Sequence, residues 1–179
     1  MQLVRVRNFV DALAGARIGS TYNQYAASDL RRARLADYLL RRSGARYLLV
    51  GEAAGYRGAR VSGLPFTSER QLTGEGPAEA TATIVQRVLA ELGVEDDVLL
   101  WNVVPTHPGT ETSNRQPTRA EVGEAMPFLQ ELLRGRSPIA VGRLAHRALG
   151  GRYVRHPSHG GSAAFREGLL LSIRSCGTC

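Results

Sequence analysis

The stretch that decides the fold runs from residue 46 to residue 72 and reads RYLLVGEAAGYRGARVSGLPFTSERQL. Its apolar run, residues 47–50, ends at Gly51, which is typical of a buried strand that stops at a turn. The loop that follows is rich in glycine and arginine and closes at Pro65 and Phe66. In open α/β sheets, ligands bind at the carboxyl ends of the strands. The stretch therefore predicts a binding site that contains backbone amides and an aromatic ring.

Three more strands are predicted downstream, and helical patterns separate them. The apolar run 98–101 ends at Asn102, residues 138–142 form a third strand, and residues 153–154 form a brief fourth strand. Helices are expected at residues 10–16, 28–42, 77–92, 118–133, 143–149 and 162–171. Strands that alternate with helices indicate a parallel sheet covered on both faces. We expect an α/β fold: a three-layer α/β/α sandwich with a central, mainly parallel four-stranded sheet, in one domain spanning residues 1–179.

The composition is that of a globular protein with a basic surface. The chain has 179 residues and a net charge of +7, and all 23 of its basic residues are arginine. A positive surface suits a polyanionic partner such as DNA, because neutralised phosphates release their counterions. No apolar run reaches the roughly 20 residues that span a bilayer, and the N-terminus shows no secretory signal. We expect a monomer of the bacterial cytoplasm that binds DNA and no membrane.

The two cysteines, Cys176 and Cys179, form a single CxxC in the last four residues. A zinc site needs a second such pair or histidines at ligand spacing, and the sequence offers neither. The simplest interpretation is a terminal tail without a functional role. We therefore expect no metal and no cofactor.

Three of the predicted loops directly follow strands, so a parallel sheet brings them to one edge. That edge would hold the ring of Phe66, the amide of Asn102, the imidazole of His156 and the carboxylate of Glu52. An amide pairs with both donors and acceptors on the edge of a base. An aromatic ring stacks on a base, which contributes roughly 1–3 kcal/mol. Together these groups are equipped to hold a nucleobase that has been flipped out of the stack.

The same residues resemble the motifs of the uracil-DNA glycosylase superfamily, over about residues 47–170. The first motif stands here as GEAAG (51–55) followed by GLPF (63–66), the second as a strand that ends in WN (101–102), and the last as HPS (156–158). The Gly-Glu-Ala opening and the later NRQP (114–117) are similar to the thermostable bacterial branch, family 4. The spacing from Gly51 to Phe66 is more like that of the single-strand-selective monofunctional branch.

The resemblance implies a role for each side chain of the pocket. Phe66 would stack on the extruded base, and Asn102 would read its Watson–Crick edge. His156 would donate a hydrogen bond to the base carbonyl as negative charge grows there, and a neutral imidazole suffices for this. Backbone groups of the first motif, at Gly51 and Ala53, would complete the base site. Residues expected to contact DNA are Arg155, Ser158, His159, Arg57, Arg60 and Arg115.

The sequence departs from the family pattern at the residue that positions the attacking water. Several relatives carry Asp or Asn two residues after the first glycine, where this chain has Ala53. Glu52 is then the only carboxylate of the loop, and we assign it to water positioning, with His159 as a second candidate. An ion pair between Glu52 and Arg57 or Arg60 is an equally good interpretation. The iron–sulfur cluster of family 4 needs four cysteines, which this chain lacks.

Several of these residues also have simpler interpretations. Asn102 is suited to turning the loop after its strand, and the histidines His107 and His159 are most simply surface residues. For both Arg115 and Arg155, a structural ion pair and a phosphate contact remain open as interpretations. The arginines of the helix predicted at residues 28–42 are most simply a solvated helix face.

We expect a monofunctional DNA glycosylase that flips out uracil or a related modified base and hydrolyses its N-glycosidic bond, leaving an abasic site for base excision repair. Two alternatives remain open. One is a glycosylase for phage-type modified bases in antiviral defence, which the arginine-bearing loop 56–60 favours. The other is a protein that binds damaged DNA without catalysis, which Ala53 favours.

Overall fold

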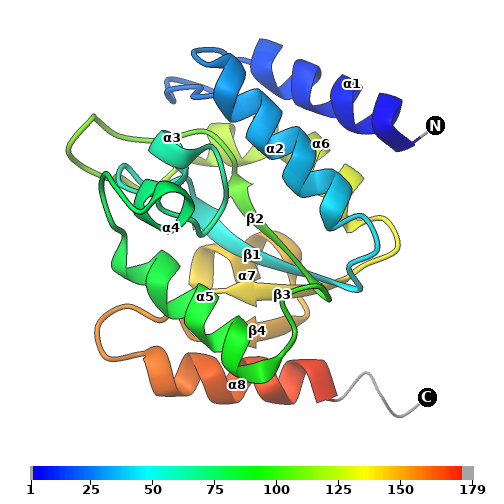
Figure 1. Ribbon diagram of the computed structural model, residues 1–179, viewed down its shortest axis with the longest axis vertical. Helices are drawn as coiled ribbons and strands as arrows, with labels where there is room; N and C mark the ends of the chain where they lie inside the picture. Colours follow the sequence, from blue (N-terminus) through cyan, green and yellow to red (C-terminus); the bar gives the residue numbers. More distant parts are fainter. Residues whose placement is uncertain (1, 175–179) are drawn as a thin grey trace.

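A four-stranded parallel sheet forms the centre of the molecule (Figure 1). The structure, a computed structural model, describes residues 2–174, so Cys176 and Cys179 lie outside the described residues. The strands are β1 (Tyr47–Ala53), β2 (Val98–Val104), β3 (Ser137–Val141) and β4 (Arg152–Val154), in the spatial order β2-β1-β3-β4. Every neighbouring pair is parallel, which confirms the predicted sheet.

Helices cover both faces of the sheet, and each face has its own apolar core. The helices α1 (Gln2–Gly15), α2 (Asp29–Arg41), α6 (Arg119–Leu133) and α7 (Arg143–Leu149) contribute to one cluster of buried side chains. The helices α5 (Ala80–Leu92) and α8 (Ser162–Arg174) contribute to the other. Side chains alternate along a strand, so Leu48 and Val50 join the first cluster whereas Tyr47 and Leu49 join the second. The predicted three-layer α/β/α sandwich is confirmed.

The capping residues fix two helices where the sequence predicts them. The hydroxyl of Ser28 accepts a hydrogen bond from the Arg31 amide at the start of α2. Thr118 and Glu121 form a reciprocal capping box at the start of α6, which satisfies two amides that a helix start otherwise leaves unpaired. The first helix differs from the prediction, because α1 begins at Gln2 rather than at residue 10.

Strands β1 and β2 extend further than predicted, and this places two site residues inside the sheet. Gly51 and Asn102 are paired in register, and the pairing continues to Ala53 and Val104. The loop expected after β1 also contains two short helices, α3 (Ala59–Ser62) and α4 (Glu69–Thr73). These helices lie on the side of the molecule toward which the strand arrowheads point (Figure 1).

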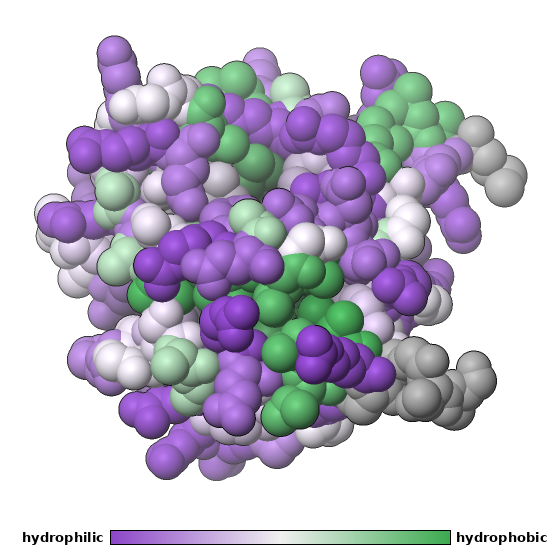
Figure 2. Space-filling model, turned by 60° about the horizontal axis from the view of Figure 1, so that its bottom comes forward, coloured by the Kyte–Doolittle hydropathy of each residue, from purple (hydrophilic) through white to green (hydrophobic). Residues whose placement is uncertain are grey.

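The surface is mostly hydrophilic. Figure 2 shows the lower side of the Figure 1 view, where polar side chains surround a smaller apolar area. Leu171 on α8 is the most exposed large apolar residue of the described chain, at 62%. None of the helices within residues 2–174 has the length and apolar character that crossing a bilayer requires.

Candidate active site

A cleft of about 720 Å³ opens at the carboxyl ends of the strands. Its lining comes from all four strand ends and from the first residues of α5. Most of the residues predicted for the pocket meet there: Glu52, Ala53, Phe66, Asn102, Arg115, His156, Ser158 and His159 all line it. The topology therefore gathers side chains that lie more than one hundred residues apart in the sequence.

Phe66 and Asn102 meet directly above Gly51. A β-carbon on residue 51 would collide with the ring of Phe66 and would lie 2.9 Å from the Oδ1 atom of Asn102. Glycine at this position therefore leaves the room in which the ring and the amide lie side by side. Phe66 itself has a left-handed backbone, with φ of 49°, which is uncommon for a bulky residue and occurs where the surroundings enforce it.

The Asn102 amide is available for a ligand. The residue is only 4% exposed, yet its side chain forms no hydrogen bond to any other residue within 2–174 and lines the cleft. Amides at such low exposure are normally paired within the protein. A base edge presented to Asn102 would restore those hydrogen bonds, so the position favours ligand recognition over the turn-forming role.

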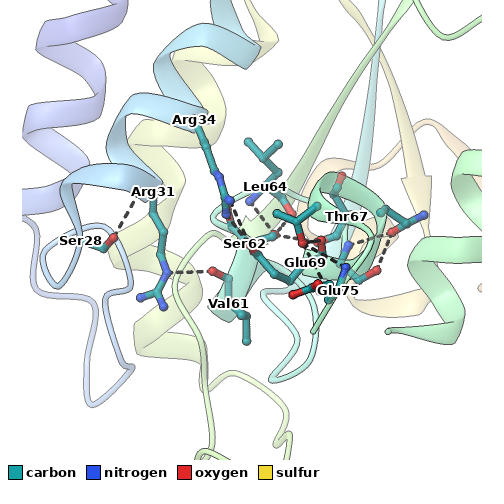
Figure 3. A network of polar contacts seen from close by, with 12 residues as sticks. Ser28, Arg31, Arg34, Val61, Ser62, Leu64, Thr67, Glu69 and Glu75 are labelled. Atoms are coloured by element: carbon teal, nitrogen blue, oxygen red, sulfur yellow. Dashed lines mark hydrogen bonds and ion pairs between the residues drawn. The ribbon is translucent and has the colours of Figure 1, made fainter. Parts of the chain in front are cut away.

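Helix α2 holds the segment that carries Phe66 (Figure 3). The Arg34 guanidinium forms a bidentate ion pair with Glu69, at 2.8 and 2.9 Å, and also donates to the Ser62 carbonyl. Arg31 donates to the Val61 carbonyl at 2.9 Å. The prediction of a solvated helix face is thus wrong for Arg31 and Arg34, because both side chains point into the protein and bind the glycine-rich segment.

Further hydrogen bonds hold the same segment from inside and from α5. The Ser62 hydroxyl donates to the Thr67 carbonyl at 2.7 Å and accepts from the Leu64 amide at 3.0 Å. From α5, the Gln86 amide donates to the carbonyl of Phe66 at 3.0 Å. The left-handed Phe66 is therefore fixed from several directions, which keeps the ring in place before any ligand arrives.

His156 presents one ring nitrogen to the cleft in a defined protonation state. Its Nδ1 accepts a hydrogen bond from the Ser158 amide at 3.2 Å and lies 2.8 Å from the Ser158 hydroxyl. An accepting Nδ1 carries no proton, so the neutral ring holds its proton on Nε2. Burial lowers the pKa of His156, and the nearby His159 lowers it further. The neutral ring with an Nε2–H donor is thus the favoured form near pH 7.

The Ser158 hydroxyl lies between two imidazoles, since the Nδ1 of His159 is also within 3.0 Å. His159 is exposed and has a left-handed backbone, with φ of 52°. The exposed side chain of Arg155 folds toward Gly161, where a β-carbon would lie 3.3 Å from its Nε atom. The loop at residues 155–161 is therefore organised by its own side chains.

Glu52 is half-buried in the cleft and forms no ion pair with another residue of the described chain. Burial raises the pKa of its carboxyl, and the positive charge of Arg147 opposes this rise. The predicted partners are engaged elsewhere. Arg60 pairs with Glu111 at 2.9 Å, and the guanidinium of Arg57 lies 5.3 Å from the centre of the Tyr56 ring.

Arg115 forms the structural ion pair that the sequence left open. Its guanidinium binds both carboxylate oxygens of Glu121, at 2.6 and 2.8 Å, and donates to the Ser20 hydroxyl. Glu121 is 2% exposed, and the Arg115 hydrogen bonds hold the pKa of its carboxyl at about 2. Arg115 thus lines the cleft with most of its donors already used.

Sequence reasoning missed three charged residues of the cleft: Glu79, Arg143 and Arg147. The two arginines follow β3 directly, on α7, and the rule that ligands bind at strand ends would have found them. The surface prediction for His107 is wrong. Its ring is fully buried and lies 2.7 Å from both the Ala54 and the Thr110 carbonyls, so it ties the first motif to the loop after β2.

The described part of the chain shows no candidate metal site. Within residues 2–174, no three His, Cys, Asp or Glu side chains are grouped so that they could hold a metal ion.

Comparison with known proteins agrees with this geometry. The family model of the uracil DNA glycosylase superfamily matches residues 40–172. The chain belongs to this superfamily. The fold is similar to the crystal structure of wild-type SMUG2 from Pedobacter heparinus, with a TM-score of 0.73, 13% sequence identity and 99% of each chain covered. No curated protein matches the chain. Membership of the superfamily supports a DNA glycosylase in general terms.

Proposed function

We propose that the protein is a monofunctional DNA glycosylase that flips out uracil or a related modified base and hydrolyses its N-glycosidic bond. One observation carries the proposal. The Phe66 ring and the Asn102 amide lie together over Gly51, in a cleft that His156 also lines. A face for stacking, an amide for a base edge and a neutral donor are what recognition and release of a base require.

The proposed chemistry depends on interactions that strengthen as the bond breaks. When the C1′–N bond cleaves, its electron pair stays on the departing base, and negative charge grows on a base carbonyl. A hydrogen bond from His156 to that carbonyl stabilises the transition state more than the bound base, which is the condition for catalysis. The chain contains no lysine, so a lyase step through a lysine Schiff base is disfavoured and an abasic site is the expected product.

The partner that we propose is DNA, bound by one protein molecule. The four arginines predicted to contact the DNA backbone differ in whether another residue already engages them. Arg57 and Arg155 remain exposed, whereas Arg60 and Arg115 hold carboxylates.

The experiment is a panel of single- and double-stranded oligonucleotides that carry uracil, hypoxanthine, xanthine or hydroxymethyluracil, followed by alkaline cleavage. We expect strand breaks at one or more of these bases. Replacement Asn102→Ala or His156→Ala is expected to lower the single-turnover rate by about 10²–10³-fold, the usual effect of removing one preorganised donor. If no substrate yields strand breaks, the proposal is refuted. If both variants keep full activity, the assignment of Asn102 and His156 to the site is refuted.

A bulkier modified base is the second candidate substrate. Arg143 and Arg147 add unpaired positive charge to the cleft lining, beyond what the amide and ring need to hold a plain base. Excision from hypermodified phage DNA, with none from uracil DNA, would favour this candidate. Tight, salt-sensitive binding with no base release would instead indicate a non-catalytic DNA-binding protein.

A further inference from the structure

Glu79 is a carboxylate in the cleft that has no structural task. It precedes α5 and is the N-cap residue of that helix, but its side chain accepts no capping hydrogen bond. It is half-buried, lines the cleft and forms no ion pair with any other residue in the described part of the chain. Carboxylates are rarely buried unless they are paired, so an unpaired one in a cleft needs another explanation.

The glycine-rich loop passes close to this carboxylate. A β-carbon on Gly55 would collide with the Oε1 atom of Glu79, and one on Gly58 would collide with its Oε2 atom. Two glycines that are three residues apart thus leave room for the two oxygens of one side chain. Burial raises the pKa of the Glu79 carboxyl, as expected for a group that has lost water without gaining a cation.

Glu79 lies on the side of the sheet where the base-binding residues lie. Helix α5 and Phe66 belong to the same apolar cluster, and the Phe66 ring and the Asn102 amide both lie close to the β-carbon position of Gly51. Glu52 is directed differently. Its pKa responds to Arg147 on α7, and α7 packs into the opposite cluster. Of the two carboxylates in the cleft, Glu79 is therefore the one that shares a wall with the base platform.

We infer that Glu79, rather than Glu52, faces the sugar of the flipped nucleotide and takes the proton of the attacking water. The inference rests on the proposed glycosylase function. The C1′–N bond breaks with its electron pair on the base, and a lone pair of water forms the new C1′–O bond. One water proton passes to the Glu79 carboxylate and then to solvent, while solvent protonates the base anion. Before the attack, the carboxylate stabilises the positive charge that develops on the sugar.

The test compares Glu79→Gln with Glu75→Gln and Glu52→Gln. Glu75 is an exposed residue of the same segment, so its replacement removes the same charge outside the cleft. Each protein is given oligonucleotides that carry either a cationic pyrrolidine or a neutral tetrahydrofuran in place of the reactive sugar. Binding to both is measured by fluorescence anisotropy, and thermal unfolding verifies that each variant is folded.

We expect the wild-type protein to bind the cationic analogue more tightly than the neutral one. In Glu79→Gln this ratio of affinities should be at least about tenfold smaller. The single-turnover rate of base release should fall by about 10²-fold or more, as when a general base is removed. Glu79→Asp should recover part of both, whereas Glu75→Gln should leave both unchanged. A smaller loss in Glu79→Gln than in Glu52→Gln would overturn the inference.

The binding readout separates this inference from the proposed function. If the wild-type protein releases no base from any oligonucleotide, the proposed function fails and the proton-accepting role of Glu79 fails with it, and the analogue preference then reports only whether Glu79 faces the sugar. If base release is present and the preference and rate are the same in Glu79→Gln as in the wild type, the glycosylase function stands and the role of Glu79 is refuted.

Discussion

The two walls of the cleft are built on different principles. The α5-side wall consists of Phe66, Asn102 and Glu79, and the α7-side wall consists of Glu52, Arg143 and Arg147. On the α5 side, contacts at Gly51, Gly55 and Gly58 fit the loop to the side chains. On the α7 side, no ion pair within residues 2–174 holds any of the three charged groups.

This difference separates two tasks of recognition. A preorganised wall suits a base that must be held in one orientation, because no reorganisation is needed when the bond breaks. Unpaired arginines suit a phosphate backbone, because charge attraction acts over several ångströms and tolerates many positions. We therefore expect the α5-side wall to control the rate of base release and the α7-side wall to control affinity for DNA.

Among the replacements that test the difference between the two walls, Gly51→Ala is expected to have the largest effect. The added methyl group has to displace either the Phe66 ring or the Asn102 amide, which lies 2.9 Å from the β-carbon position. Overpacking of this kind costs about 1–3 kcal/mol, and we expect the single-turnover rate to fall by at least about tenfold.

The matched control is Gly123→Ala on α6, where no atom lies within 4 Å of the new β-carbon. Alanine in the middle of a helix is favoured over glycine by about 1 kcal/mol, so this variant should unfold at a higher temperature with unchanged activity. Equal activity of the two variants would show that the ring and the amide move freely, contrary to a preorganised wall.

Removal of the clamp on Phe66 should have the next largest effect. In Arg34→Leu the bidentate pair with Glu69 is lost, and the two side chains of that pair are only 19% and 20% exposed. We expect the free energy of unfolding to fall by about 1–3 kcal/mol, with a lower rate of base release. Urea denaturation measures the first and single-turnover kinetics the second.

The same helix offers the control. Arg41 pairs with Asp37 at 2.9 Å, but these side chains are 65% and 63% exposed, and exposed pairs contribute little. Arg41→Leu should therefore change the free energy of unfolding by less than about 0.5 kcal/mol. A comparable loss in both variants would assign the effect to helix α2 as a whole and not to the clamp.

On the α7-side wall, we expect the double replacement Arg143→Gln and Arg147→Gln to weaken DNA binding without a large change in rate. If each arginine contacts one phosphate, the slope of log K against log salt becomes shallower by about 0.7–0.9 for each. Anisotropy titrations at several salt concentrations measure this slope. An unchanged slope with a strongly reduced rate would place these arginines at the reacting nucleotide instead.

The smallest expected effect is a shift in how the rate of base release falls at acidic pH. Base release requires neutral His156, whose pKa is lowered by burial and by His159. The rate of the wild-type protein should therefore persist below the ordinary histidine value of about 6.5 and fall as the pH drops through the lowered pKa. In His159→Gln a positive neighbour is lost, so the pKa of His156 rises and the limb moves to higher pH. A limb that stays in place, or moves to lower pH, would contradict this coupling.

Much of the fold follows from local sequence signals. The four apolar runs became the four strands, and the capping residues Ser28 and Thr118 begin helices where expected. Helix α1 begins earlier than predicted because Val6, Phe9, Val10 and Leu13 form one apolar stripe among exposed arginines. The proposed base site followed from strand ends, since Phe66, Asn102 and His156 line one cleft.

The remaining site residues depend on tertiary contacts that no local pattern reports. Glu79 follows no strand and belongs to no motif, and only the approach of α5 to two glycines brings it into the cleft. The direction of Arg34 depends on where α4 packs, and the burial of His107 depends on two carbonyls from different loops. Sequence spacing places residues along an element but does not say which neighbour an element will meet.

The clamp from α2 also sets the minimum length of a working enzyme. The part of the chain that the superfamily model matches, residues 40–172, contains every residue of the cleft but omits Arg31 and Arg34. A shortened chain with those boundaries would keep every residue that lines the cleft. It would lose the two arginines whose side chains donate hydrogen bonds to Val61, Ser62 and Glu69. The left-handed Phe66 would then be held only by the hydrogen bonds that Ser62 and Gln86 form. Helix α2, most of which precedes the matched residues, is in this sense part of the support of the proposed site.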